Sequence, residues 1–477
     1  MVDQPLVVDL DGTLIHTDML HESALKVFRD TPLEALRVPC LLARGKAFLK
    51  RHLASRIDFD PGTLPYNEEL LEWLRVKRDE GRRLVLCTAS DKSIADPIAR
   101  HLGIFDDVIA SDGTVNITGE AKADTLLQHF ATTGYDYAGN SHKDLPVWSA
   151  ARRAIVVNGS TALIRKARNV TTVEQVFPRR SVGFAGWRRT LRVHQWLKNL
   201  LLFVPLIAAH ELGNAEAWLS LLLAFAAFSL CASAVYIAND LLDLESDRRH
   251  PRKRNRPFAA GLMPAYQGVL LAPLLLAVSM VIASLVGPQF LGCLVLYFTL
   301  TSAYSWLLKR LLLIDCLALA LLYTLRIIAG AAAVGQHLSF WLLAFSVFLF
   351  LSLAFVKRYA ELEVQLLSGV DRIHGRGYHT ADASLIQTMG IVSGYCSALV
   401  LALYLNSDDV LELYSSPEFI WGAVPVMLFW VSWMWMQAHR GVMHDDPLVF
   451  ALKDPVSLLA GTTLAGVLVA GTVGFAW

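Results

Sequence analysis

The stretch NDLLDLESDRRHPRKRNRPFAAG, residues 239–261, directly follows the apolar run FSLCASAVYIA, residues 228–238. It brings four acids and six bases to the end of an apolar segment. Asp240, Asp243 and Asp247 have the spacing i, i+3, i+7, which lines up three carboxylates on one face of a helix. Because like charges repel and Mg²⁺ prefers oxygen ligands, this spacing predicts a Mg²⁺ site that leaves room for phosphate oxygens.

The residues around these acids extend the predicted site. Asn239 lies four residues before Asp243 and can join the same face of the helix. His250, Lys253 and Arg256 follow the acids and are suited to binding phosphate. The alternative is a charge cluster that only anchors a membrane helix and fixes its topology. That alternative explains the bases well and the acids poorly.

The composition of the chain indicates a membrane protein with a soluble part. Of the 477 residues 54 % are hydrophobic, and most long uncharged runs lie after residue 198, whereas residues 1–180 have the charge density of a soluble domain. Apolar runs of the ~20 residues that a bilayer requires predict nine spans. They begin near residues 198, 216, 264, 289, 312, 338, 387, 418 and 455.

The charges of the connecting loops predict the orientation of these spans. Lys and Arg gather at 248–256, 309–310 and 357–376, whereas the alternate connections HELGNAE, GPQ, GQH and NSDDVLELYSSPE contain neither. We therefore expect the basic connections and the N-terminal domain on the cytoplasmic side. No signal-peptide pattern opens the chain, the net charge of +1 gives no reason to expect nucleic acid, and the six cysteines are expected to be free thiols in a reducing compartment.

The motif N-D-x-x-D-x-x-x-D followed by R-P resembles the first aspartate motif of the UbiA superfamily of intramembrane prenyltransferases. The resemblance covers about residues 180–477. It implies nine helices around a cavity that opens to the cytoplasmic side, and Mg²⁺ that holds a diphosphate. The span count and orientation expected above agree with it.

A second acid pair, which the aromatic prenyltransferases of this superfamily carry on a later helix, is missing. The stretch YSWLLKRLLLIDCLALALLYTLRIIAG, residues 304–330, has Asp315 alone, with Arg326 further along the same helical face. An arginine within a span usually faces a functional cavity, although a buried structural Asp–Arg pair is the alternative. With RVHQWLKN (192–199) and FVKRYAELE (355–363), this stretch resembles the decaprenyl-phosphate phosphoribosyltransferase branch.

That resemblance implies transfer of 5-phosphoribosyl from phosphoribosyl diphosphate (PRPP) onto a polyprenyl phosphate. Asp240, Asp243 and Asp247 would hold Mg²⁺–diphosphate, and one acid cluster suffices because the lipid carries only a monophosphate. The implied substrate-binding residues are Gln195, Lys198, Asn199, Asn239, His250, Lys253, Arg256, Tyr304, Lys309, Asp315, Arg326, Lys357 and Arg358. Two alternatives stay open: some of these bases only enforce topology, and the reaction is instead prenyl transfer to an aromatic acceptor.

The N-terminal stretch PLVVDLDGTLI, residues 5–15, is an apolar strand that ends in D-x-D-G-T and resembles the first motif of the haloacid dehalogenase (HAD) superfamily. The resemblance implies a Rossmann-like sheet, with Asp9 as the nucleophile that attacks phosphorus and Asp11 as general acid and base. Three further motifs follow in the order of that superfamily: RRLVLCTAS (82–90), GEAKADTLL (119–127) and YAGNSHKDLPVW (137–148).

These later motifs imply the remaining roles of a phosphatase site. Thr88 would donate a hydrogen bond to phosphate, Lys122 would neutralise it, and Asp144 would join Asp9 and Asp11 as a Mg²⁺ ligand. Asn140 stands where the fourth motif of the superfamily usually has a first acid. Residues 16–80 show helical periodicity, and their position between the first two motifs matches a small helical cap.

Together these features predict a HAD-like α/β domain over residues 1–175 with its cap at about 16–80, a linker at 176–192, and an all-α, nine-helix UbiA-type bundle over 193–477. We expect a bifunctional enzyme of the bacterial inner membrane, with both sites on the cytoplasmic side, one Mg²⁺ in each domain, and homo-oligomerisation left open. The HAD domain would remove the 5-phosphate of the product and leave a polyprenyl-phosphoryl ribose, an arabinose-donor precursor for the cell envelope. Alternatively, the HAD domain is an unrelated phosphatase, or it only binds or regulates.

Overall fold

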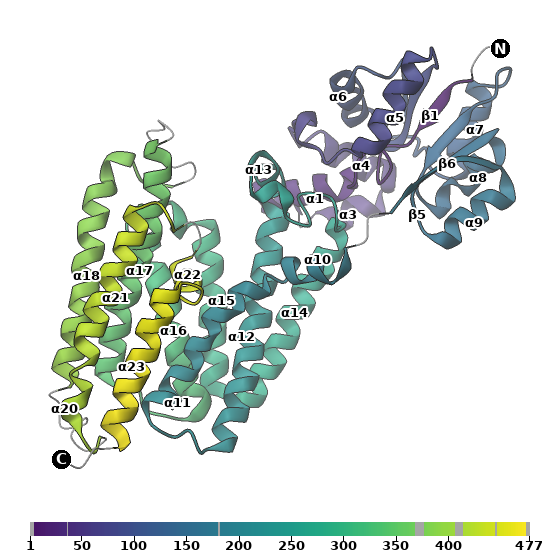
Figure 1. Ribbon diagram of the computed structural model, residues 1–477. Coiled ribbons are helices and arrows are strands. Elements are labelled where there is room, and N and C mark those ends of the chain that lie inside the picture. Colours follow the sequence, from purple (N-terminus) through teal and green to yellow (C-terminus); the bar gives the residue numbers. More distant parts are fainter. Residues whose placement is uncertain are drawn as a thin grey trace. The chain divides into compact units, whose positions relative to one another are not determined.

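The computed structural model of the protein describes residues 4–35, 37–179, 182–367, 376–405, 414–443 and 446–473. The chain forms two compact units, whose elements are labelled in Figure 1. The first unit combines Met1–Leu191 with Tyr236–Ala272, and the second combines Arg192–Val235 with Pro273–Trp477. The charged stretch 239–261 therefore belongs to the same unit as the N-terminal α/β domain.

The α/β domain is built on one parallel sheet of six strands in the order β3-β2-β1-β4-β5-β6. All three residues of β1 are fully buried, as expected for the centre of a parallel sheet that is covered on both faces. The strand order changes direction at β1, and α/β sheets bind ligands at the carboxyl ends of the strands at such a point. The strands are β1 (Leu6–Val8), β2 (Leu84–Asp91), β3 (Asp107–Ser111), β4 (Asp136–Gly139), β5 (Arg153–Gly159) and β6 (Thr172–Pro178).

Helices connect these strands, as the sequence predicts for an α/β fold. Helix α5 (Glu68–Asp79) begins after Asn67, whose side chain accepts a hydrogen bond from the Leu70 backbone N–H, and it buries Leu70, Leu71 and Leu74 in the sheet core. The other connecting helices are α6 (Lys92–Leu102), α7 (Glu120–His129), η2 (His142–Asp144), α8 (Leu145–Ala150) and α9 (Thr161–Val170).

A helical insert lies between β1 and α5, where the sequence predicts a cap. Its elements are α1 (Met19–Asp30), α2 (Pro32–Ala35), α3 (Val38–Ala43), α4 (Lys46–Ala54) and η1 (Pro61–Thr63). The insert has a small core of its own, formed by Val27, Leu49 and Leu53. Helix α5, although inside the predicted range 16–80, packs with the sheet.

The rest of the first unit comes from the middle of the chain. Helix α12 (Ala215–Leu242) stops at Leu242, and α13 (Leu244–Arg249) starts after Asp243, whose backbone φ of −102° and ψ of 17° interrupt the helix. The remaining elements of the unit, or those that begin in it, are α10 (Gly183–Thr190), η4 (Lys253–Asn255) and α14 (Ala265–Val286). The predicted acid stretch is thus helical up to Arg249.

The second unit is a helical bundle. At its centre, α17 (Phe340–Leu367) packs between α16 (Ile314–Val334) and α18 (Ala383–Tyr404). A Cβ atom added at Gly390 of α18 would lie 2.2 Å from Cζ2 of Trp435, so glycine permits this close helix approach. The other elements are η3 (Val193–Phe203), α11 (Val204–Ala208), α15 (Pro288–Trp306), η5 (Leu308–Arg310), η6 (Thr380–Asp382), α20 (Pro417–Ile420), α21 (Ala423–His439), α22 (Pro447–Ala451) and α23 (Pro455–Val473).

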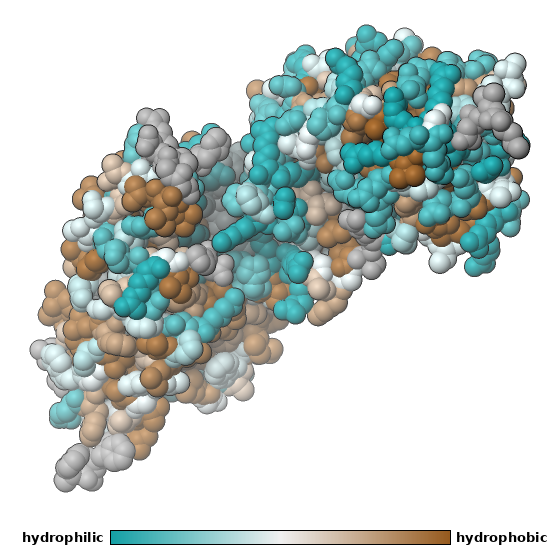
Figure 2. Space-filling view, turned by 45° about the horizontal axis from the view of Figure 1, so that its top comes forward, coloured by the Kyte–Doolittle hydropathy of each residue, from teal (hydrophilic) through white to brown (hydrophobic). Residues whose placement is uncertain are grey.

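Seven helices in the described residues are long and apolar enough to cross a membrane. Their outward faces carry exposed apolar side chains, such as Leu385, Val392 and Leu399 of α18, and Figure 2 shows hydrophobic residues gathered over the bundle. Apolar side chains left exposed along helices are the surface that lipid requires. The chain is therefore a multi-pass membrane protein.

Two of the nine predicted spans do not meet these criteria. The span expected near residue 198 is a 3₁₀ segment, η3, followed by the short helix α11, which begins around Pro205. Proline lacks a backbone N–H and favours the first turn of a new helix, so the chain restarts there rather than continuing as one helix. The span expected near 289 is α15, whose 19 residues include Gln289, Thr299 and Thr301 and fall outside the seven.

Candidate active sites

The predicted HAD motifs meet at the carboxyl ends of the central strands. Asp9 follows β1, and its Oδ1 accepts a hydrogen bond from Nζ of Lys122 at 2.7 Å. The same ammonium donates to the hydroxyl of Tyr137 at 2.9 Å and to the Cys87 carbonyl at 3.2 Å. The Tyr137 hydroxyl donates in turn to Asp144 Oδ1 at 3.1 Å. Four segments that are distant in sequence thus form one buried polar network.

Asp144 is held on its other side by the backbone. Its Oδ2 accepts hydrogen bonds from the backbone N–H groups of Asn140, at 3.0 Å, and Ser141, at 2.8 Å. Asn140, which replaces the usual acid, lies against the first motif, because a Cβ atom added at Gly12 would be 2.0 Å from Asn140 Nδ2. Position 12 therefore has no space for a side chain, and its backbone φ of +75° also favours glycine.

The carboxyl of Asp11 is positioned separately. Its Oδ1 accepts a hydrogen bond from the Met19 backbone N–H at 2.8 Å, and its Oδ2 accepts one from the Ser90 hydroxyl at 2.7 Å. Thr88 is fully buried beside it, and its hydroxyl accepts a hydrogen bond from the Ser90 backbone N–H. The structure therefore brings Asp9, Asp11, Thr88, Lys122 and Asp144 together in one domain, as the motifs predict.

Burial dominates the electrostatics of this site. It raises the pKa of Asp9 above its ordinary value despite the neighbouring Lys122, and the negative charge of Asp144 raises that pKa further. Burial and the charge of Asp18 raise the pKa of Asp11 to about 7. A carboxyl with a pKa near neutrality is suited to giving and taking a proton.

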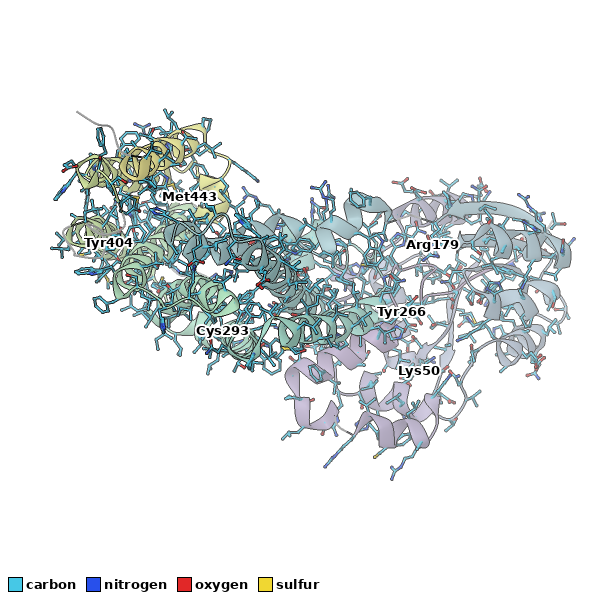
Figure 3. The ribbon with its side chains drawn as sticks, turned by 90° about the horizontal axis from the view of Figure 1, so that it is seen from below. Lys50, Arg179, Tyr266, Cys293, Tyr404 and Met443 are labelled. Carbon is cyan, nitrogen blue, oxygen red and sulfur yellow. The ribbon has the colours of Figure 1, made fainter. Side chains whose placement is uncertain are left out.

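One cation of the site was missed by the sequence reasoning. Lys50 lies on α4 of the insert and is labelled in Figure 3. Its Nζ donates hydrogen bonds to the Ala89 carbonyl at 2.6 Å and to Asn116 Oδ1 at 3.2 Å. Burial lowers the pKa of Lys50, against the effect of the negative charge of Asp11. No motif marks Lys50, because its position depends on the packing of the insert. Ser90 and Tyr137, in contrast, lie within the quoted motifs.

Two of the three aspartates of the charged stretch, Asp240 and Asp247, converge on one guanidinium. Arg256 Nη1 donates to Asp240 Oδ1 at 3.1 Å and to Asp247 Oδ2 at 2.6 Å. The two carboxylates are 3 % and 1 % exposed, whereas Asp243, between them, is half-buried. The backbone N–H of Asp243 bonds to the Asn239 carbonyl and that of Asp247 to the Asp243 carbonyl, so helical spacing is kept across the interruption. Asp240 and Asp247 therefore face the same guanidinium, whereas a shared face with Asp243 stays a prediction.

The donor chemistry of these residues fits Mg²⁺. Within the described ranges, no group of three or more His, Cys, Asp or Glu side chains is placed so as to hold a metal ion. Mg²⁺, however, commonly takes one or two carboxylates and completes its shell with phosphate oxygens and water. Asp247 Oδ1 is buried and has no hydrogen-bond partner in the part of the chain that the structure describes, with Lys253 Nζ at 3.9 Å, so this oxygen is suited to a cation.

The second unit contains its own buried charge cluster. Lys198 Nζ donates to Asp446 Oδ2 at 2.7 Å, and the Tyr323 hydroxyl donates to both carboxylate oxygens at 2.7 and 2.8 Å. Lys357 Nζ lies 3.8 Å from the same carboxylate. Burial opposes ionisation of Asp446, but the two lysines hold its pKa well below its ordinary value. This cluster joins Lys198 and Lys357, two predicted phosphate-binding residues.

Arg326 is buried in α16, and its guanidinium makes three hydrogen bonds and a ring contact. Its guanidinium donates to Asn199 Oδ1 at 3.0 Å, to the Tyr297 hydroxyl at 3.1 Å and to the Leu322 carbonyl at 2.5 Å. It also lies over the ring of Tyr297, with 4.8 Å from Cζ to the ring centroid. Arg326 and Asn199, predicted from different stretches, therefore lie in direct contact.

Asp315 and Arg326 do not pair with each other. Asp315 is fully buried at the start of α16, where it forms ion pairs with Arg358 and, at 3.4 Å, Arg376, and accepts a hydrogen bond from the Tyr378 hydroxyl. Residues three helical turns apart share a face but are about 16 Å apart along the axis, too far for side chains to meet. The alternative of a buried structural pair between Asp315 and Arg326 is therefore wrong, because Asp315 pairs with Arg358 instead.

The remaining predicted residues lie at helix ends. Gln195 is half-buried in η3, Asn239 is half-buried in the last turn of α12, and His250 is exposed. The His250 Nδ1 accepts hydrogen bonds from the backbone N–H groups of Arg252 and Lys253. Tyr304 and Lys309 are half-buried near the end of α15 and in η5. None of these placements assigns a role, so their substrate contacts stay predictions.

Comparisons with known proteins identify the family. A model of the UbiA prenyltransferase family matches residues 200–453. The chain belongs to the UbiA prenyltransferase family. A second family model, for haloacid dehalogenase-like hydrolases, matches residues 6–149, so the N-terminal α/β domain is a HAD-like domain fused to the UbiA domain.

Three relatives extend this assignment. The uncharacterized protein y4nM of Sinorhizobium fredii is 39 % identical over 98 % of this chain and 90 % of its own length, a match that spans both domains. Nodulation protein NoeC of Azorhizobium caulinodans is 36 % identical over 60 % of this chain and 92 % of its own. Decaprenyl-phosphate phosphoribosyltransferase of Mycolicibacterium smegmatis is 30 % identical over 57 % of this chain and 87 % of its own.

Among solved structures, a UbiA homolog from Archaeoglobus fulgidus bound to GPP and Mg²⁺ matches 60 % of this chain and 99 % of its own, with 15 % identity and a TM-score of 0.45.

Asp446 is the acid of the UbiA domain that the sequence reasoning missed. It precedes Pro447 in the connection between α21 and α23. Its side chain accepts a hydrogen bond from the backbone N–H of Leu448, so Asp446 caps the start of α22. An acid followed by proline before an apolar run is a helix-start signal, so the cap was predictable but the lysine partners were not.

We expect Asp446→Ala to destabilise the UbiA-family chain by about 3 kcal/mol. The side chains of Lys198 and Asp446 are only 11 % and 7 % exposed, so removal of the acid leaves a buried ammonium without its counter-charge. Thermal unfolding of the detergent-solubilised chain measures the effect. Glu418→Ala, at an exposed acid of α20, is the matched control and should change the stability by less than about 0.5 kcal/mol. Equal melting temperatures for the two variants would contradict the ion-pair assignment.

Proposed function

We propose that this chain transfers 5-phosphoribosyl from PRPP to a polyprenyl phosphate and that its HAD domain then removes the 5-phosphate. The observation that carries the proposal is the pair of buried carboxylates, Asp240 and Asp247, which Arg256 joins. The later stretch 304–330 carries one acid, Asp315, instead of a second acid pair. The similarity to proteins named decaprenyl-phosphate phosphoribosyltransferase supports the same donor and acceptor.

In the proposed transfer, an oxygen of the lipid phosphate attacks C1 of the ribose. The bond between C1 and the diphosphate oxygen breaks, and the diphosphate leaves with the electron pair. The lipid phosphate is already ionised at neutral pH, so no strong general base is required. Mg²⁺, when bound by Asp240, Asp243 and Asp247, supplies charge stabilisation of the leaving diphosphate.

Basic side chains would hold the phosphates. Arg256 keeps Asp240 and Asp247 together and adds positive charge beside the diphosphate. Lys198 and Lys357, which share Asp446, supply a second cationic centre for a phosphate oxygen. We propose the same substrate-binding role for Gln195, Asn199, Asn239, His250, Lys253, Tyr304, Lys309, Asp315, Arg326 and Arg358.

In the proposed phosphatase step, Asp9 attacks the phosphorus of the 5-phosphate and forms an aspartyl-phosphate. Asp11 gives its proton to the departing 5-hydroxyl, and later accepts a proton from the water that hydrolyses the aspartyl-phosphate. Lys122, 2.7 Å from Asp9, offsets the negative charge of the phosphate, and Thr88 donates a hydrogen bond. Mg²⁺ held by Asp9, Asp11 and Asp144 would screen the incoming phosphate.

The proposed location follows the distribution of charge along the chain. The basic connections and the HAD domain would face the cytoplasm of a bacterium. The water-soluble donor PRPP would reach the site from that side. We propose domain limits of 1–175 and 193–477, with 176–192 as the linker. The product would be a polyprenyl-phosphoryl ribose, a precursor for an arabinose donor.

The donor is the decisive test of this function. Purified chain is incubated with Mg²⁺ and polyprenyl phosphate and with PRPP labelled in the ribose, and the organic phase is counted. Labelled lipid is the expected result. In a parallel assay, the chain is incubated with labelled prenyl diphosphate and an aromatic acceptor, and the prenylated product is measured. Prenylated product there, with no label transferred from PRPP, would overturn the proposal in favour of an aromatic prenyltransferase.

A further inference from the structure

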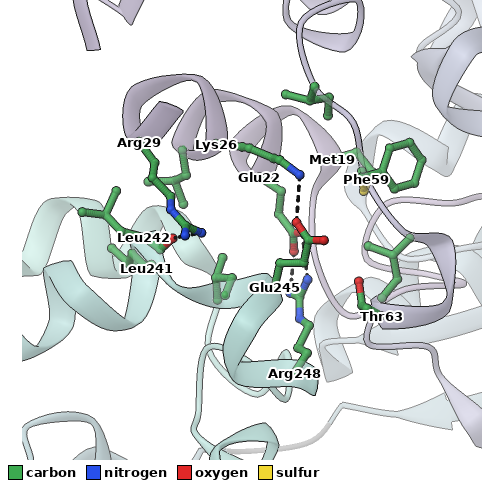
Figure 4. A pocket seen from close by; sticks show the side chains of 14 residues that line it. Met19, Glu22, Lys26, Arg29, Phe59, Thr63, Leu241, Leu242, Glu245 and Arg248 are labelled. Atoms are coloured by element: carbon green, nitrogen blue, oxygen red, sulfur yellow. Dashed lines mark hydrogen bonds and ion pairs between the residues drawn. The ribbon is translucent and has the colours of Figure 1, made fainter. Parts of the chain in front are cut away.

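Helix α13, which carries Asp247, is held by a helix of the HAD domain within the first unit. The guanidinium of Arg248 makes a bidentate ion pair with Glu22 of α1, at 2.9 Å from Nη1 to Oε2 and 2.6 Å from Nη2 to Oε1 (Figure 4). The two side chains are 6 % and 13 % exposed. A buried, two-point contact of this kind fixes orientation as well as distance.

Two more contacts join the same helices. Lys26 Nζ lies 2.8 Å from Glu245 Oε2, and Arg29 Nη1 donates to the Leu242 carbonyl at 3.2 Å (Figure 4). Glu22, Lys26 and Arg29 have the spacing i, i+4, i+7 and therefore share one face of α1. This face meets the last turn of α12 and the first turn of α13, on either side of Asp243.

The space between these helices is too small to hold a substrate. Apolar and charged side chains, among them Met19, Leu241 and Leu244, enclose a cavity of about 50 Å³. Such a volume holds one or two water molecules. The residues around it are paired with each other, so this region is a packed joint between helices.

Arg248 also joins the basic loop to this joint. Its Nε donates to the Ala259 carbonyl at 3.0 Å, while both of its Nη atoms bond to Glu22. The loop between these two residues carries Lys253 and Arg256, and Arg256 bonds to Asp240 and Asp247. A change at Glu22 therefore acts on the helix with the acids and on the loop with the bases.

The first turn of α1, which carries Glu22, also reaches the HAD site. The Met19 backbone N–H, in the first turn of α1, donates to Asp11 Oδ1 at 2.8 Å. One helix of twelve residues thus links a catalytic carboxyl of the HAD domain to the helix that carries the transferase aspartates.

We propose that Glu22 is a positioning residue of the transferase, and that the HAD domain, through α1, holds α13 and its basic loop in the arrangement that binds Mg²⁺–diphosphate. The HAD domain is then a structural part of the diphosphate site in addition to any phosphatase chemistry. The inference rests on the proposed function only in the assignment of Asp240, Asp243 and Asp247 to the diphosphate.

Binding of inorganic diphosphate in the presence of Mg²⁺ tests this role on the full-length chain in detergent, by calorimetry. Glu22→Arg places a second cation against Arg248 and should raise the Kd for diphosphate at least about tenfold, as loss of a residue that orients metal ligands does. Glu22→Gln, which keeps the shape and one acceptor, should raise it less. In the transfer assay Glu22→Arg should raise the KM for PRPP more than it lowers kcat.

Glu34→Arg is the matched control. Glu34 also lies in the helical insert and forms an ion pair with Arg56 at 2.7 Å, away from α13, so its reversal should leave the Kd unchanged. A folded Glu22→Arg chain with the wild-type Kd would overturn the inference, and if that variant does not fold, a wild-type Kd for Glu22→Gln would do so. Wild-type chain that binds diphosphate but transfers nothing from PRPP would refute the proposed function alone. Wild-type chain that binds no diphosphate would refute the aspartate assignment and this inference with it.

Discussion

Asp247→Asn is expected to lower the rate of phosphoribosyl transfer by about 10³-fold, equivalent to about 4 kcal/mol of transition-state stabilisation. Asp247 is 1 % exposed, and its Oδ1 is one of the buried oxygens that have no hydrogen-bond partner among the described residues. An asparagine keeps the volume and can still accept a bond from Arg256, but it removes the negative charge that a cation requires. Transfer of labelled ribose to lipid, at saturating PRPP and varied Mg²⁺, measures the loss.

The affinity for the donor separates a metal ligand from a merely buried acid. If Asp247 holds Mg²⁺–diphosphate, the variant should need more Mg²⁺ and should bind PRPP more weakly. Loss of transfer in Asp240→Asn or Asp247→Asn with normal PRPP affinity would show that the metal site is misassigned. Glu216→Gln, at an exposed acid at the opposite end of α12, is the control and should transfer at the wild-type rate.

Local sequence was sufficient for the HAD site because most of its residues follow a strand directly or lie at the start of a helix. In a parallel sheet the carboxyl ends of the strands lie at one edge, so motifs in the right order must converge. Asp9 after β1, Thr88 in β2 and Asp144 after β4 follow this rule. Lys50 does not, because an insert of several short helices has no periodic register that would place one side chain over the sheet.

In the UbiA domain, the sequence predicted which charged residues would matter better than it predicted which of them contact each other. The acid spacing of 239–247 and the convergence on Arg256 come from adjacent turns of one segment, so local geometry decides them. The pairs Lys198–Asp446 and Arg358–Asp315 join residues 248 and 43 positions apart and depend on how helices pack. Helix packing angles are tendencies that a single sequence does not specify.

Hydropathy predicted nine spans, and seven helices among the described residues are long and apolar enough to cross a membrane; the segments that begin near residues 198 and 289 are not among the seven. The apolar run from residue 198 contains Pro205, and a window average does not register the loss of a backbone donor. The same run contains Lys198 and Asn199, which are buried by polar partners in the bundle. Composition alone cannot distinguish a lipid-facing span from a broken segment that carries site residues.

Asp9→Asn is expected to abolish removal of the 5-phosphate, with a loss of at least about 10³-fold, because no carboxylate remains to attack phosphorus. The measurement is the lipid product formed from labelled PRPP and polyprenyl phosphate, separated by charge. Wild-type chain should yield the ribosyl lipid, whereas the variant should accumulate the 5-phosphorylated lipid. Total label in lipid should stay close to that of wild type, since the transfer aspartates are unchanged.

Two further variants make this result decisive. Asp9 is the counter-charge of the buried Lys122, so Asp9→Asn is compared with Asp11→Asn, which leaves that ion pair intact and removes the acid and base together with one proposed Mg²⁺ ligand. Both should accumulate the same 5-phosphorylated lipid. Asp124→Asn, at an exposed acid two residues from Lys122 on α7, should give the wild-type product. If Asp9→Asn and Asp11→Asn both yield the wild-type product, the HAD domain does not act on this lipid, and its role is confined to binding, regulation or the support of α13.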